Sequence, residues 1–69
     1  MNDINDILPV LEKAKAKWQL RCERARRLRD TNNPKYNEFM FGKAIGHYQA
    51  ICNIIQEVNN LNKTYNYEN

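Results

Sequence analysis

Apolar residues recur in the first half of the chain at alternating spacings of three and four, the repeat of a helix that packs along one face. The positions are Ile4, Ile7, Leu11, Ala14, Trp18, Ala25 and Leu28. Arg21 occupies the one place in this series where another apolar residue is expected. Asp6 can act as the N-cap, and Pro9 then lies in the first turn, where backbone N–H groups have no helical acceptor. The pattern predicts a helix over about residues 6–30.

Turn-forming residues interrupt this pattern over residues 30–34. Asn33 is a residue type that caps helices, and Pro34 suits the first position of the helix that follows. The apolar series then resumes with the same spacing at Phe41, Ala44, Tyr48, Ile51, Ile55 and Val58. We therefore expect a turn at residues 31–33 and a second helix over about residues 34–62. Because five of the last eleven residues are asparagine, we expect a flexible tail at residues 64–69.

Two helices of similar length joined by a short turn predict an all-α fold, an antiparallel two-helix hairpin over residues 1–63. The second helix is apolar over about half of its circumference, because further apolar residues flank its main series. These flanking residues are Met40, Ile45, Cys52, Ile54 and Leu61. One neighbouring helix cannot cover so wide a face, so we expect two hairpins to pair through their second helices as a homodimer, a four-helix bundle. The alternative is a monomer that leaves apolar surface exposed. The predicted interface residues on this face are Tyr48, Ile51, Ile54, Ile55 and Val58.

The residue types needed for catalysis are missing or isolated. Serine is absent, threonine occurs only at positions 31 and 64, and the single histidine, His47, has no acidic residue at helical spacing. These observations exclude a serine or threonine triad. Cys22, Cys52 and His47 form no metal-binding motif, and a turn near residue 32 places the two cysteines too far apart for a disulfide. We therefore expect a protein that is not an enzyme, has no cofactor or metal, and keeps both cysteines as free thiols.

The chain contains no segment with the length and apolarity of a membrane span. It also lacks the basic and then apolar start of a signal peptide. We therefore expect a cytoplasmic location and no membrane partner.

Charge is concentrated in the first predicted helix. Residues 13–29 include eight basic residues and one acid, a local net charge of +7 in a chain whose total is +3. Glu23 can pair at helical spacing with Arg26 and Arg27, but four cations on one side of the helix have no such partner. We call these four residues the basic stripe: Lys13, Lys17, Arg21 and Arg24. A basic stripe on a helix is typical of proteins that bind polyanions, and the alternative is a solvated face that keeps the protein soluble.

Arg21 occupies a position of the apolar series where the side chain would be buried, and burying an unpaired guanidinium costs free energy. An acid from a second protomer, Glu68 or an anionic ligand could neutralise it. Alternatively, the side chain reaches outward to solvent beside Trp18.

Three functions fit these features. The first is a non-enzymatic binding protein that uses the basic stripe and Arg27 to bind an anionic partner, most simply DNA or RNA. The second is a regulatory or inhibitory protein of the phage or mobile-element type that docks on a host protein. Its contact residues would be Phe39 and a row of small residues at Gly42, Gly46 and Ala50. The third is an oligomer that sequesters an anionic nucleotide between subunits.

In length and hairpin layout, the chain resembles the small dimeric helical hairpins that bind RNA in plasmid copy-number control. It shares no residue pattern with them, so the resemblance concerns architecture and does not by itself imply a function.

Overall fold

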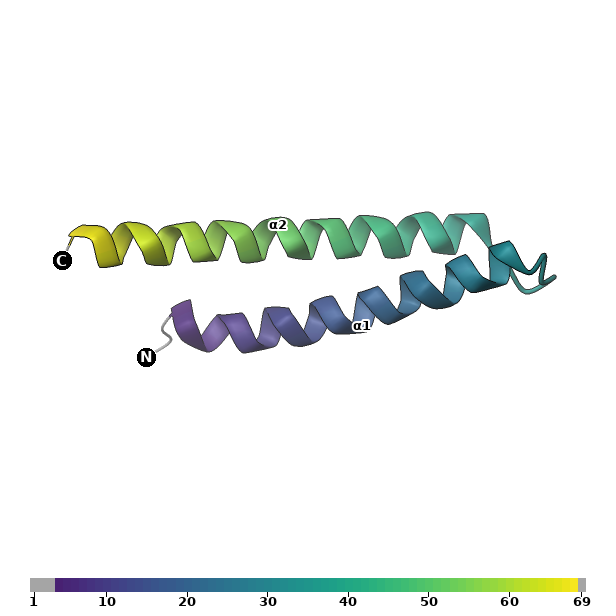
Figure 1. Cartoon of the computed structure of the whole chain (residues 1–69), viewed down its shortest axis with the longest axis horizontal. Coiled ribbons are helices and arrows are strands. Elements are labelled where there is room, and N and C mark those ends of the chain that lie inside the picture. Colours follow the sequence, from purple (N-terminus) through teal and green to yellow (C-terminus); the bar gives the residue numbers. More distant parts are fainter. Residues whose placement is uncertain (1–3, 69) are drawn as a thin grey trace.

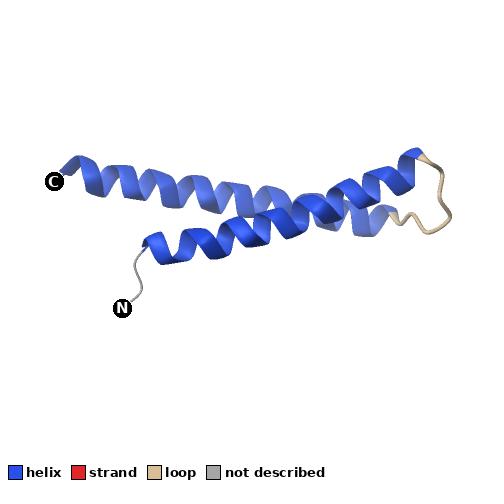
Figure 2. Ribbon diagram, turned by 60° about the horizontal axis from the view of Figure 1, so that its bottom comes forward, coloured by secondary structure: helices blue, strands red, loops and turns tan. Residues whose placement is uncertain are grey.

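The two predicted helices are both present. The computed structural model describes residues 4–68 and the side chains of residues 6–61. Helices α1 (Ile4–Asp30) and α2 (Glu38–Glu68) run in opposite directions and pack against each other (Figure 1). A loop joins them at one end (Figure 2), and the described residues contain no strand. The prediction of an all-α hairpin is therefore confirmed.

A Schellman motif ends α1. The N–H of Asn33 donates to the carbonyl oxygen of Leu28 at 2.9 Å, and the N–H of Asn32 donates to the carbonyl oxygen of Arg29 at 3.1 Å. Asn32 has a φ of 53°, a left-handed conformation that asparagine tolerates better than most residues. The chain therefore turns sharply away from the helix axis after Asp30.

Helix α2 begins four residues later than the pattern predicted. The side-chain oxygen of Asn33 accepts a hydrogen bond from the N–H of Lys35 at 2.9 Å, which forms a local turn and not a helix cap. The cap is Asn37, whose side-chain oxygen accepts a hydrogen bond from the N–H of Met40 at 3.0 Å. The loop is therefore longer than the predicted turn at residues 31–33.

The outer ends of both helices also differ from the pattern. Helix α1 begins at Ile4, two residues before the predicted start. Helix α2 continues to Glu68, past the predicted end near residue 62, and includes most of the segment expected to be a flexible tail; Asn69 lies outside the described residues. No glycine or proline follows Gly46, and each residue added to an existing helix gains a backbone hydrogen bond. Nothing in the sequence therefore terminates α2 earlier.

The two helices share a narrow core. Among the described side chains only Cys22, Ala44 and Ile55 are buried, each at most 8% exposed. The predicted α2 series faces α1, since its other members are half-buried: Phe41, Tyr48, Ile51 and Val58. On α1 the contact row includes Cys22, while Arg21 is exposed. The predicted α1 series otherwise lies on this side of the helix, since Leu11, Ala14, Trp18, Ala25 and Leu28 are half-buried.

The hairpin exposes more surface than a globular protein of its mass. Its accessible area is 5900 Å², whereas a compact monomer of this size has about 4,500 Å². Its radius of gyration is 16.1 Å, compared with about 11 Å for a compact chain of this length. Large apolar side chains contribute to the exposed area: Ile7, Val10, Leu20, Phe39, Met40, Ile45, Ile54 and Leu61.

Candidate anion-binding surface

The basic stripe lies on α1 with all four side chains exposed. The spacing of four, four and three residues keeps the cations on one side of the helix. None of them pairs with a carboxylate among the side chains that the structure describes. Within that part of the chain the one ion pair joins Arg29 to the adjacent Asp30 at 3.2 Å, and the pairs expected between Glu23 and Arg26 or Arg27 do not form. The stripe therefore keeps its positive charge uncompensated by the chain's own described acids.

Aromatic stacking positions the side chain of Arg21. Its guanidinium carbon lies 4.5 Å from the centroid of the Trp18 ring, a cation–π contact. Trp18 also stacks on His47 of α2, with centroids 4.2 Å apart and an angle of 16° between the rings. Arg21 therefore extends to solvent along the Trp18 ring. This is the expected alternative in which the side chain reaches outward, and there the guanidinium needs no buried counter-ion.

A cleft opens between the helices on the side of the basic stripe. It has a volume of about 200 Å³, with an apolar lining and three cations around it. The lining residues are Trp18, Arg21, Arg24, Ala25, Leu28, Met40, Lys43 and Ala44. No acidic side chain lines this cleft, so its electrostatic potential favours an anion.

Lys43 is the member of this cleft that sequence reasoning missed. It lies on α2, outside the apolar series and away from the charge-rich segment, so neither periodicity nor local charge marked it. The hairpin geometry nevertheless allows its position to be predicted. A turn centred near residue 34 brings Lys43 level with Arg24, and the two cations line the same cleft.

Arg24 and Leu28 also line a second depression together with Leu20 and Arg27. Its volume is about 360 Å³. Because Arg24 belongs to both cavities, a continuous basic surface runs from Arg27 to Lys43. Lys13 and Lys17 line neither cavity and extend the same surface along α1 toward its N-terminus.

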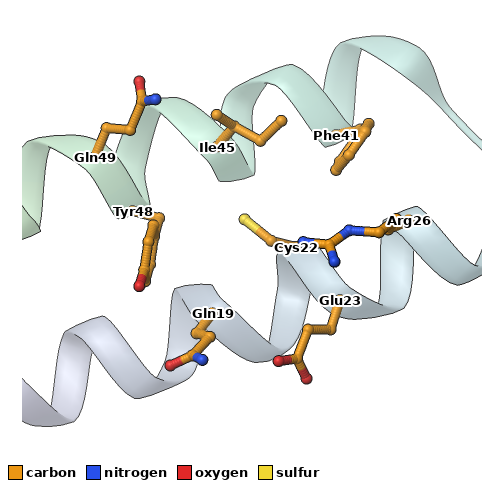
Figure 3. Close-up of a pocket in the computed structure, with 8 residues that line it drawn as sticks. All are labelled: Gln19, Cys22, Glu23, Arg26, Phe41, Ile45, Tyr48 and Gln49. Carbon is orange, nitrogen blue, oxygen red and sulfur yellow. The ribbon is translucent and has the colours of Figure 1, made fainter.

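The other side of the hairpin has a different character. A pocket of about 300 Å³ is lined by Gln19, Cys22, Glu23, Arg26, Phe41, Ile45, Tyr48 and Gln49 (Figure 3). It contains one acid and one cation, so it carries no excess charge. This pocket provides no anion site, and its residues are suitable controls for the basic stripe.

Both cysteines are free thiols, as the spacing predicted. Burial raises the pKa of the Cys22 thiol above its ordinary value, which keeps it protonated and unreactive near neutral pH. The pKa of Tyr48 is also raised, mainly by a hydrogen bond with Cys52. Among the described residues no group of three or more histidine, cysteine or acidic side chains could hold a metal ion.

The aromatic residues near the loop close the end of the hairpin. Tyr36 and Phe41 make an edge-to-face contact with ring centroids 6.1 Å apart. Arg29 lies over the Phe41 ring at 5.2 Å. Phe39, in contrast, is 77% exposed.

The predicted interface residues fall into two groups. Tyr48, Ile51, Ile55 and Val58 face α1 within the hairpin, while Ile54 remains 45% exposed. In the row of small residues, a Cβ atom built on Gly42 or Gly46 would meet no atom within 4 Å. Ala50 is also exposed, so this row faces open space and takes no part in packing the hairpin.

Comparison of the chain with protein-family models, curated proteins and solved structures finds no match. Within the described residues, neither helix contains an apolar stretch long enough to cross a bilayer.

Proposed function

We propose that the protein is a non-enzymatic, dimeric binding protein that holds an anionic partner, most simply DNA or RNA, on the basic surface of α1. The observation that carries this proposal is the absence of carboxylate partners for Lys13, Lys17, Arg21 and Arg24 among the described side chains. Arg27 and Lys43 extend the same surface.

A solvated face that serves only solubility mixes charges of both signs. The basic surface instead mixes cations with apolar side chains. Leu20 is 66% exposed beside Arg24 and Arg27, and Leu28 and Met40 line the adjoining cleft. Exposed apolar groups among unpaired cations suit a partner that offers phosphates together with flat apolar surfaces, as nucleic acids do.

The size of the stripe also suits a nucleic acid. From Lys13 to Arg24 the helix rises about 17 Å, the axial length of about five base pairs. Cations that neutralise phosphates release the counterions of the nucleic acid, so binding should depend strongly on salt. With four phosphates neutralised, affinity should fall about a hundredfold between 50 and 200 mM salt.

Fluorescence anisotropy with labelled duplex and single-stranded DNA and RNA tests this function. We expect binding at low salt that Lys17→Glu with Arg24→Glu abolishes. The matched control is Arg26→Glu with Lys35→Glu, which makes the same change in net charge away from the basic stripe and should leave most of the affinity intact. Absence of binding by the unchanged protein at 50 mM salt would overturn the proposal, as would equal losses in the two double variants.

A second candidate function is docking on a host protein, as expected of a small regulatory protein. The observation that favours it is the exposure of Phe39 next to Gly42 and Gly46, neither of which contacts another part of the hairpin. Gly46→Leu would fill this surface without altering the basic stripe. Loss of a specific protein from nuclease-treated affinity captures, with nucleic-acid binding unchanged, would favour docking over the first function.

A further inference from the structure

Each helix carries a row of mostly apolar residues at the edge of the hairpin core, interrupted by Arg21 on α1 and by His47 on α2. On α1 the row follows a seven-residue repeat through Ile7, Ala14, Arg21 and Leu28. On α2 it follows the same repeat through Met40, His47, Ile54 and Leu61. We call these two rows together the open face. Four of its apolar members are between 44% and 54% exposed: Ile7, Met40, Ile54 and Leu61.

The two rows open on the same side of the hairpin. Arg21 and Leu28 of α1 line one cleft together with Met40 of α2. Each row lies next to the core row of its own helix, so each helix presents apolar residues to two neighbours at once. Such wide apolar faces occur in bundles in which every helix packs against two others. The hairpin supplies one neighbour, and the open face lacks the second.

The exposed area fits a partner of the size of this chain. The accessible surface exceeds that of a compact monomer of the same mass by about 1,400 Å², and a standard protein interface covers about 800 Å² on each partner. The excess accessible area is therefore large enough to contain one complete interface, and the remainder comes from the elongated ends of the helices.

The charges that border the open face on α2 are complementary to a second copy in one orientation. Lys43 lies seven residues before Ala50, and Glu57 lies seven residues after it, so the three share one row along the edge of the face. A two-fold axis at Ala50 makes the α2 helices antiparallel and brings Lys43 beside Glu57 of the second copy, twice. A parallel arrangement would instead place like charges together. The small side chain of Ala50 also lets the two helices approach closely.

We infer that the open face binds a second copy of this chain, with the two α2 helices antiparallel across a two-fold axis at Ala50. This inference rests on the dimer in the proposed function and gives that dimer its interface and orientation. In this bundle the two α1 helices also lie side by side. Arg21 and Lys43 then lie at the interface, and the remaining cations Lys13, Lys17, Arg24 and Arg27 of both copies border one shared surface. An anionic partner that bridges the two copies would also offset the repulsion between these cations.

Native mass spectrometry and sedimentation equilibrium of the full chain test the interface. We expect twice the chain mass of 8.2 kDa. Ile54→Lys should give a monomer, because it places a charge within the open face. Gln56→Lys is the matched control, with the same charge change at an exposed position outside that face, and should remain dimeric.

Charge exchange tests the orientation. Lys43→Glu or Glu57→Lys alone should weaken dimerisation about tenfold, since each change turns two attractive pairs into two repulsive ones. The double variant should restore it. A monomeric unchanged protein would overturn this inference and the dimer in the proposed function together. A dimer that is insensitive to Ile54→Lys would overturn the interface. A dimer that is insensitive to the charge exchange would overturn the orientation. Neither result would contradict the binding of an anion by a dimer.

Discussion

The indole ring of Trp18 and the imidazole ring of His47 stack across the two helices, with centroids 4.2 Å apart and nearly parallel planes. This contact joins the middle of α1 to the first third of α2 and thereby sets which residues of the two helices lie level with each other. Arg21 lies against the same indole ring. One aromatic side chain thus couples the register of the hairpin to the position of a cation in the basic stripe.

Because Trp18 is half-buried and contacts residues of both helices, Trp18→Ala should lower the free energy of unfolding by about 2–3 kcal/mol. Urea denaturation followed by circular dichroism at a fixed protein concentration measures the change. Leu20→Ala is the control, since Leu20 is 66% exposed, and it should cost less than about 0.5 kcal/mol. Equal effects of the two substitutions would contradict the role assigned to the stack.

The ionisation of the Cys22 thiol should make the free energy of unfolding depend on pH in alkaline solution. Burial raises the pKa of its thiol above the ordinary value of 9.0, so the unfolded chain loses this proton at lower pH than the folded chain. The stabilisation is therefore complete below pH 9.0 and is lost as the pH rises toward the folded-state pKa. Unfolding free energies measured from pH 7.5 to 9.5 should fall more steeply for the unchanged protein than for Cys22→Ala. Parallel pH profiles would show that Cys22 does not contribute.

Glycine in a helix costs about 1 kcal/mol relative to alanine. An added Cβ at Gly42 or Gly46 meets no neighbouring atom within 4 Å. Gly42→Ala and Gly46→Ala should therefore each raise the free energy of unfolding of the protein by up to about 1 kcal/mol. Thermal and urea unfolding measure the gain. A loss of stability would mean that another molecule packs closely against these glycines in solution.

The cap of α2 distinguishes the observed helix start from the one expected at Pro34. Asn37→Ala removes the acceptor of the Met40 N–H and should lower the free energy of unfolding by about 1 kcal/mol. Asn33→Ala removes only the acceptor of a hydrogen bond within an exposed loop and should cost less. If Asn33→Ala proved the more damaging change, the helix would start near Pro34 in solution.

Much of the hairpin follows from the sequence alone. The α2 series from Phe41 to Val58 was predicted to form one packing face, and these residues are the ones that face α1. Its spacing left a single helical face on which all six residues could be buried together. The unpaired cations of the basic stripe were likewise predictable, because a surplus of basic over acidic residues within one helix leaves few partners at helical spacing.

Tertiary structure decided what local patterns left open. Both Asn33 and Asn37 can cap a helix, and the path of the loop selected Asn37. On α1, packing against α2 buries Cys22 and leaves the neighbouring Arg21 exposed at the position where the pattern called for a core residue. Lys43 joined the basic surface only because the hairpin brought it level with Arg24. Periodicity is a property of one helix, whereas these choices depend on which neighbour each face meets, and a single helix does not contain that information.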